Sequence, residues 1–201
     1  MTVTAAPAAA LLPGFRDPVH DSQRCFRALL DAMARPGTLV SLPAPQALPD
    51  GWTPALTALA LTLFDQETTV WLDSAAASAA AHLRFHCGCP LAERPERATF
   101  AVIAAPASMP PLHAFPIGDP QYPDRSATLI LALPSLADGP ALRLTGPGIK
   151  GEAMAAPQGL PPKFVHQWAD NHALYPSGID VILTAGDRAM GLPRGVAIEE
   201  A

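Results

Sequence analysis

Apolar positions repeat along the chain with two different spacings. A spacing of three or four residues predicts helices at 18–35, 54–63, 74–86 and 161–175. Continuous or β-branched apolar runs predict strands, and these alternate with the helices along much of the sequence. The alternation favours an α/β fold with a mixed central sheet flanked by helices. The predicted strands are 38–42, 68–72, 99–103, 126–133, 142–145, 179–184 and a hairpin return at 189–192.

Two of the predicted helices begin with a polar cap followed by proline, at Asp17-Pro18 and at Thr53-Pro54. The first should end near Arg35, because Pro36 disfavours helical geometry in the residue before it. Its apolar positions predict one buried stripe, made of Val19, Cys25 or Phe26, Leu29, Leu30 and Met33.

The domain organisation predicted is a flexible N-terminal arm over 1–16 and one α/β domain over 17–201. The arm is rich in alanine and would either stay disordered or lie on a partner. The proline-rich stretch 106–123 predicts a long irregular connection, and connections of this length in compact domains often contact ligands or partners.

Charge and cysteine content narrow the function class. The net charge is −5, opposite to what a non-specific nucleic-acid binder carries. No apolar run is long enough to cross a bilayer. Three cysteines make no disulfide framework, so we expect the protein to work in the reducing cytoplasm. Only 15% of residues are charged, which favours a surface partly covered by another subunit.

A glycine-rich corner follows the predicted strand 142–145. It contains Gly146, Pro147 and Gly148 and ends near Lys150. These residues are typical of a tight reversing turn. The same residues also suit a phosphate held by main-chain amides and one ammonium group, although the spacing matches no standard nucleotide motif.

Three further charged residues each have a structural and a functional interpretation. Asp180 is either a turn residue or a carboxylate at the rim of the sheet, able to orient a ribose hydroxyl or a partner's arginine. Arg194, behind Leu192-Pro193, and Arg35 are either solvated charges or anion clamps. If Asp180, Arg194 and the glycine corner converge, they form a polar patch for a phosphorylated ligand or a charged protein surface.

The sequence His86-Cys87-Gly88-Cys89, with His82 one turn earlier, contains residue types that bind zinc. A structural zinc site needs a second matched pair of ligands, and the sequence has none. We therefore interpret the cluster as a helix end with incidental thiols and expect no metal.

Seven segments, in the same order, resemble the H subunit family of bacterial carbon–phosphorus lyase, PhnH. Each segment is short, but together they extend over nearly the whole chain. They are Phe15–Val19, Asp31–Gly37, Leu83–His86, Arg125–Leu129, Leu144–Ile149, Tyr175–Asp180 and Leu192–Arg194.

This resemblance implies a cytoplasmic subunit that acts with the G, I and J subunits in phosphonate degradation. It further implies a homodimer in isolation and the fold of the large domain of pyridoxal-phosphate-dependent transferases, without that cofactor. The reaction supported would be displacement of adenine from ATP by an alkylphosphonate, giving a ribose 1-phosphonate 5-triphosphate, as in α-D-ribose 1-methylphosphonate 5-triphosphate synthase. The resemblance points to no catalytic residue in this subunit.

Three hypotheses follow. In the first, the chain is an accessory subunit, not catalytic alone, that supports a catalytic partner. In the second, it is a stand-alone nucleotide- or phosphate-binding transferase that uses the glycine corner, Lys150, Asp180 and Arg194. The third, a pyridoxal-phosphate enzyme, is disfavoured because neither Lys150 nor Lys163 has an obvious cofactor-binding context.

Overall fold

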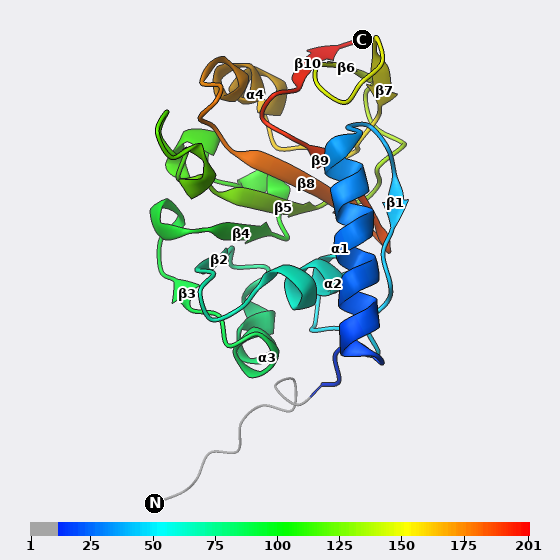
Figure 1. The fold of residues 1–201 in the computed structure, drawn as a ribbon, viewed down its shortest axis with the longest axis vertical. Helices are drawn as coiled ribbons and strands as arrows, with labels where there is room; N and C mark the ends of the chain where they lie inside the picture. Colours follow the sequence, from blue (N-terminus) through cyan, green and yellow to red (C-terminus); the bar gives the residue numbers. More distant parts are fainter. Residues whose placement is uncertain (1–11) are drawn as a thin grey trace, which may run out of the picture.

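A mixed sheet forms the centre of the computed structural model, which describes residues 12–201 (Figure 1). Within these residues it has seven strands: β1 (Val40–Ser41), β2 (Val70–Leu72), β3 (Leu91–Ala92), β4 (Phe100–Ile103), β5 (Thr128–Ala132), β8 (Asp180–Ala185) and β9 (Arg188–Leu192). Their spatial order is β1-β9-β8-β5-β4-β2-β3. Strand β9 is antiparallel to both of its neighbours, and the other pairs are parallel. The predicted α/β class with a mixed central sheet is confirmed.

The central strands are buried on both faces, which explains their continuous apolar sequences. In β5, Leu129 and Leu131 join one hydrophobic core, whereas Ile130 between them joins the core on the opposite face. Val181 and Ile182 of β8 divide between the two cores in the same way. Successive side chains of a strand point to opposite faces, so one sheet separates two cores.

Three helices pack on one face of the sheet: α1 (Pro18–Ala34), α2 (Pro54–Leu63) and α3 (Ala80–His86), the last preceded by the 3-10 turn η2 (Ala77–Ala79). Helix α1 contacts both α2 and β9 (Figure 1). Both predicted caps are present, because Asp17 accepts a hydrogen bond from the His20 amide and Thr53 accepts one from the Leu56 amide. The predicted helix 74–86 is regular only in its second half.

The buried face of α1 differs from the predicted one. Cys25 and Leu29 are buried as expected, but Val19, Phe26 and Leu30 are exposed by 75%, 46% and 52%. The predicted buried stripe was too wide. Ala32 and Asp21, whose carboxylate accepts from the Asp17 amide, are buried together with Cys25 and Leu29. The prediction is therefore wrong for Val19 and Leu30, and of the two alternatives Cys25 and Phe26 it is Cys25 that is buried.

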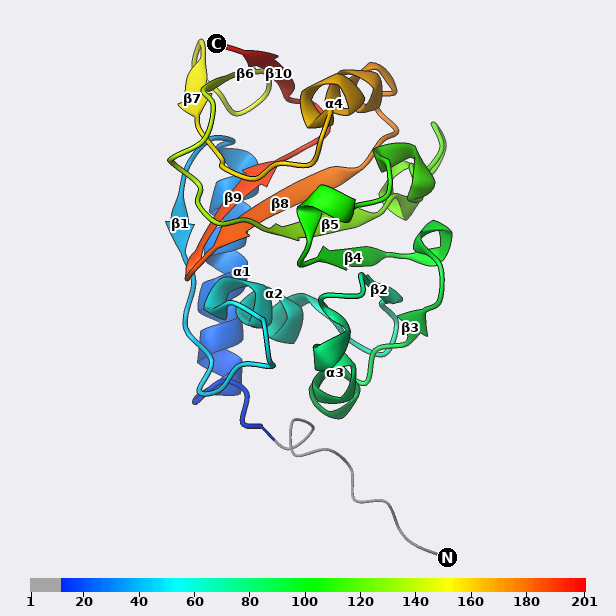
Figure 2. The same cartoon turned by 180° about the vertical axis from the view of Figure 1, so that it is seen from behind.

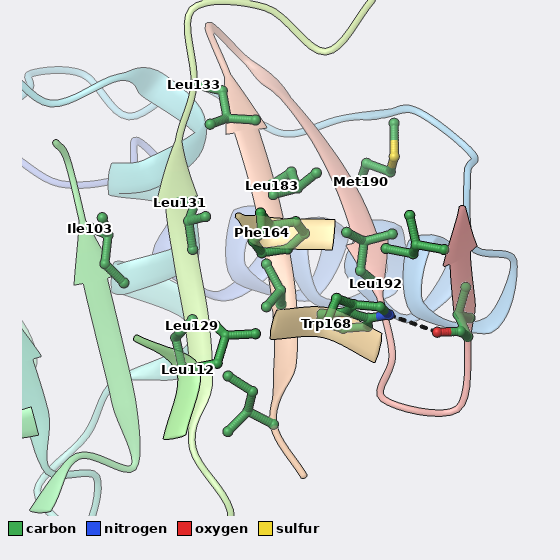
Figure 3. Packing of buried hydrophobic residues seen from close by; sticks show 14 of the residues in the cluster. Ile103, Leu112, Leu129, Leu131, Leu133, Phe164, Trp168, Leu183, Met190 and Leu192 are labelled. Atoms are coloured by element: carbon green, nitrogen blue, oxygen red, sulfur yellow. Dashed lines mark hydrogen bonds between the residues drawn. The ribbon is translucent and has the colours of Figure 1, made fainter. Parts of the chain in front are cut away.

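Helix α4 (Phe164–Ala173) covers part of the other face (Figure 2). Trp168 is completely buried there, and its indole N–H donates to the Val196 carbonyl at 2.7 Å (Figure 3). Leu112 and Phe115 of the irregular connection predicted from the prolines cover a further part of the face, and later residues such as Leu144 join the same core. The connection contains the 3-10 turns η4 (Pro106–Ser108), η5 (Leu112–Ala114) and η6 (Pro123–Arg125), and a further turn, η3 (Pro95–Arg97), precedes β4.

A second sheet was not predicted as a separate unit. In the described part of the chain it has three antiparallel strands in the order β10-β6-β7, namely β10 (Ala197–Glu200), β6 (Leu142–Thr145) and β7 (Ala153–Ala155). The sequence analysis identified only β6, because β7 has three residues and β10 ends in two exposed glutamates, so neither shows an apolar run. It also missed β3.

Residues 1–11 of the predicted arm lie outside the described residues. From Leu12 onward the segment contacts the domain: Phe15 is buried in the core beneath α1, and the Leu12 carbonyl lies 2.7 Å from Nε2 of His86. Among residues 12–201, no helix has the length and hydropathy required to cross a membrane.

Candidate functional site

The glycine corner between β6 and β7 lies against two other segments. Gly146 and Gly148 both have positive φ, at 136° and 83°. A Cβ on Gly148 would lie 2.2 Å from the carbonyl oxygen of Ala34 at the end of α1. A Cβ on Gly146 would lie 2.8 Å from the Gly195 carbonyl oxygen. The two glycines therefore allow a close approach between backbones, which no larger residue permits.

The predicted residues thus converge as backbone segments, but the side chains of Arg35 and Lys150 do not join those of Asp180 and Arg194. The end of α1, which carries Arg35, and the connection after Arg194 both contact the corner. The Arg35 guanidinium turns back along α1 to Asp31, at 3.1 Å, and is largely exposed. The Lys150 side chain is exposed.

Asp180 and Arg194 form a partly buried ion pair. Nε and Nη2 of Arg194 donate to the two carboxylate oxygens of Asp180, at 3.1 and 2.5 Å, and the Arg194 amide donates to Asp180 at 2.8 Å. The side chains are only 15% and 19% exposed. This is the fork geometry that makes arginine–carboxylate pairs strong.

The remaining N–H groups of Arg194 bond to other segments. Nη1 donates to the carbonyls of Pro123 and Pro176, at 2.8 and 3.5 Å, and Nη2 donates to the Ser126 hydroxyl at 2.6 Å. An arginine has five N–H donors, and here all five have a protein acceptor. An anion would bind Arg194 only by displacing one of them.

The ion pair also lies at the edge of the sheet where ligands are uncommon. Asp180 opens β8 and Ser126 precedes β5, so the pair is at the amino ends of the parallel strands. In open α/β sheets, ligands bind outside the carboxyl ends. At that opposite edge, the carboxylate of Asp73 accepts from the amides of Ala76 and Ala105, each at 2.8 Å. A pocket of about 290 Å³ lies near the carboxyl ends of β5 and β8 and includes Arg188.

A larger pocket of about 680 Å³ lies between the small sheet and the start of α4. Its lining is mostly apolar, including Leu142 and Phe164, with Lys163, His166 and Glu200 as its charged or titratable groups. The sequence analysis missed this pocket, because residues from three distant segments form it. The only local signal was the group of prolines that surrounds it.

The histidines and cysteines considered as zinc ligands each make different contacts in the fold. Cys87 donates to the Ala60 carbonyl, and burial raises the pKa of its thiol to about 12. His82 is fully buried, and neither ring nitrogen has a hydrogen-bond partner within the described residues. Burial, with a smaller effect of His86, lowers the pKa of His82 to about 4. Residues 12–201 contain no group of three or more side chains placed to hold a metal ion.

Comparisons with known proteins agree with the ordered motifs in the sequence. The family model described as bacterial phosphonate metabolism protein (PhnH) matches residues 13–199. The chain is 40% identical to the PhnH subunit of α-D-ribose 1-methylphosphonate 5-triphosphate synthase from Rhizobium meliloti, over 92% of this chain and 94% of that protein. It is 31% identical to the putative C-P lyase subunit protein HtxG from Stutzerimonas stutzeri, over 96% of this chain and 92% of that protein. The predicted resemblance is confirmed, and the chain belongs to the PhnH family of bacterial phosphonate metabolism proteins.

Proposed function

We propose that this chain is a non-autonomous subunit of the carbon–phosphorus lyase system in phosphonate catabolism. Its role would be to support formation of ribose 1-phosphonate 5-triphosphate from ATP and an alkylphosphonate. The subunit role is supported by the near full-length similarity to a named synthase subunit.

The Asp180–Arg194 pair is the main support for a subunit that does not act alone, because its hydrogen-bonding groups are used within the fold. Arg194 is one of the two arginines singled out in the sequence whose guanidinium could bind a phosphate. Each of its five N–H groups instead holds part of the fold. The glycine corner, the other candidate for anion binding, is packed against the Ala34 and Gly195 backbones.

The proposed partners are the G, I and J subunits, and the proposed compartment is the cytoplasm. In isolation, we propose that the chain forms a homodimer. Exposed apolar side chains support a role in assembly. Val19, Phe26 and Leu30 form a stripe on the outer face of α1, and Phe85 is 61% exposed on α3. Large apolar side chains gathered on a surface are typical of interaction sites.

We further propose that residues 17–201 form one domain related to the large domain of pyridoxal-phosphate-dependent transferases, working without the cofactor. The seven-stranded mixed sheet supports this relationship. The positions of the two lysines support work without pyridoxal phosphate. Lys150 lies between β6 and β7 and Lys163 precedes α4, so neither is at the carboxyl ends of the parallel strands.

Adenine release from ATP and methylphosphonate tests the proposal. We expect no adenine from the purified chain alone, and release when the chain is mixed with the G, I and J subunits. Omitting the chain from that mixture should reduce the rate. Turnover by the chain alone would contradict non-autonomy and favour the stand-alone transferase.

A further inference from the structure

Two turns that each carry an exposed tyrosine lie side by side at the amino edge of the central sheet. Tyr122 precedes Pro123 and Tyr175 precedes Pro176, and the carbonyls of both prolines accept from the same nitrogen, Nη1 of Arg194. The loop that carries Tyr122 also runs beside the turn after α4, because the Gly178 amide donates to the Ile117 carbonyl at 2.8 Å. Figures 1 and 2 both show this loop next to the segment that links α4 to β8.

The tyrosine patch, as we name it, consists of Tyr122, Leu174 and Tyr175, exposed by 41%, 45% and 65%. A small hollow of about 60 Å³ adjoins it, lined by Ile117, Asp170, Leu174 and their neighbours. Tyrosine is among the residue types enriched where protein interfaces gain most of their binding energy.

The patch is held in place before any partner binds. The Asp119 carboxylate accepts from the amides of Gln121 and Tyr122, at 2.9 and 2.8 Å, which fixes the tip of the loop. The Arg125 guanidinium lies over the Tyr122 ring, 4.0 Å from its centroid. A surface ordered in advance loses less conformational entropy on binding.

The charges around the patch select its occupant. Asp119, Asp124 and Asp170 are exposed at its rim, and the one arginine of the loop, Arg125, is stacked on Tyr122. Carboxylates repel a nucleotide or another phosphorylated ligand. Exposed tyrosine rings next to carboxylates attract ammonium and guanidinium groups through ion pairs and cation–π contacts.

We infer that the tyrosine patch is the docking surface for a lysine- or arginine-bearing segment of a partner subunit. The inference rests on the proposed subunit role and assigns that role to one face of the molecule. Arg194 acts beneath this face as a positioning residue, because it ties together both turns that carry the tyrosines.

Binding of the full-length chain to an assembled G–I–J complex tests the inference. Replacing both tyrosines, Tyr122→Ser with Tyr175→Ser, should weaken binding and raise the dissociation constant about 30-fold or more. Reversing charge, Asp124→Lys with Asp170→Lys, should weaken binding and flatten its dependence on salt, since ion pairs are lost. Met154→Ser, which removes a comparably exposed apolar side chain (54%) on β7, is the matched control and should bind as the unmodified chain does.

The outcomes separate this inference from the proposed function. If the unmodified chain binds the complex and the patch variants bind equally well, the docking surface is overturned while the subunit role stands. If the unmodified chain does not bind at all, both are overturned. Melting curves confirm that each variant is folded.

A photo-crosslinking residue at position 175 identifies the occupant directly. We expect a crosslink to a partner segment that contains lysine or arginine. A crosslink to a second copy of this chain, or to a segment without a cationic side chain, would overturn the inference.

Discussion

The region around the Asp180–Arg194 pair and the tyrosine patch directly outside it have opposite properties. The pair and the adjoining glycine corner carry the most distinctive sequence signals, yet their polar groups are used within the fold. Tyr122 and Tyr175 stood out only as members of longer segments, yet their side chains are exposed. The recognisable motif therefore marks contacts within the fold, and the exposed side chains outside it form the surface that we infer contacts a partner.

The largest expected effect is from Arg194→Ala. It leaves Asp180 without its partner and three acceptors without a donor, so we expect a loss of about 2–4 kcal/mol in the free energy of unfolding. Urea denaturation measures the loss. Arg125→Ala, which removes only an exposed stacking contact, should cost less than about 1 kcal/mol. If both variants are equally stable, the comparison fails and the anion-clamp interpretation of Arg194 gains support.

Gly148→Ala should have the next largest effect. A methyl group there would meet the Ala34 carbonyl at 2.2 Å, so α1 and the corner must separate. We expect a loss of about 1–3 kcal/mol, measured by thermal unfolding. Gly151→Ala is the matched control, because Gly151 has a similar φ of 80° but nothing within 4 Å of a Cβ. Equal losses would show that backbone conformation, and not close packing, requires glycine at the corner.

His82 is fully buried, and unlike Arg194 its ring makes no hydrogen bond within residues 12–201. Its pKa is about 4 in the folded chain against an ordinary 6.5, so the unfolded chain binds the proton more readily. The contribution of neutral His82 to the free energy of unfolding should be complete above about pH 6.5 and be lost as the pH falls toward 4. The loss should be about 1.4 kcal/mol for each unit by which the folded and unfolded pKa values of His82 differ.

Unfolding free energies measured between pH 7 and 4 test this linkage at His82. The His82→Leu variant should lose this part of the pH dependence, because leucine cannot be protonated. An unchanged slope in the variant would assign the pH dependence to other groups.

Lys150→Ala should have the smallest effect. The side chain is exposed, so the free energy of unfolding should change by less than about 0.5 kcal/mol. Thermal shift in the presence of inorganic phosphate then tests the anion site. Phosphate should stabilise the unmodified chain and the variant equally, if at all. A shift seen only in the unmodified chain would restore the phosphate interpretation of the glycine corner.

Local signals in the sequence were enough to determine much of this protein. Asp17-Pro18 and Thr53-Pro54 determined where α1 and α2 begin, because a cap and the amide that donates to it lie within one turn. The continuous apolar runs determined the central strands β5 and β8. The ordered motifs determined the family.

Contacts made in the folded chain determine which side of α1 is buried, that β6, β7 and β10 form their own sheet, and that Arg194 pairs with Asp180. These features depend on contacts between residues distant in the sequence. Periodicity shows that a residue is apolar, but it does not show whether another segment covers it. For the same reason, a lone arginine in the sequence has the same pattern whether it binds a ligand or holds two turns of its own chain together.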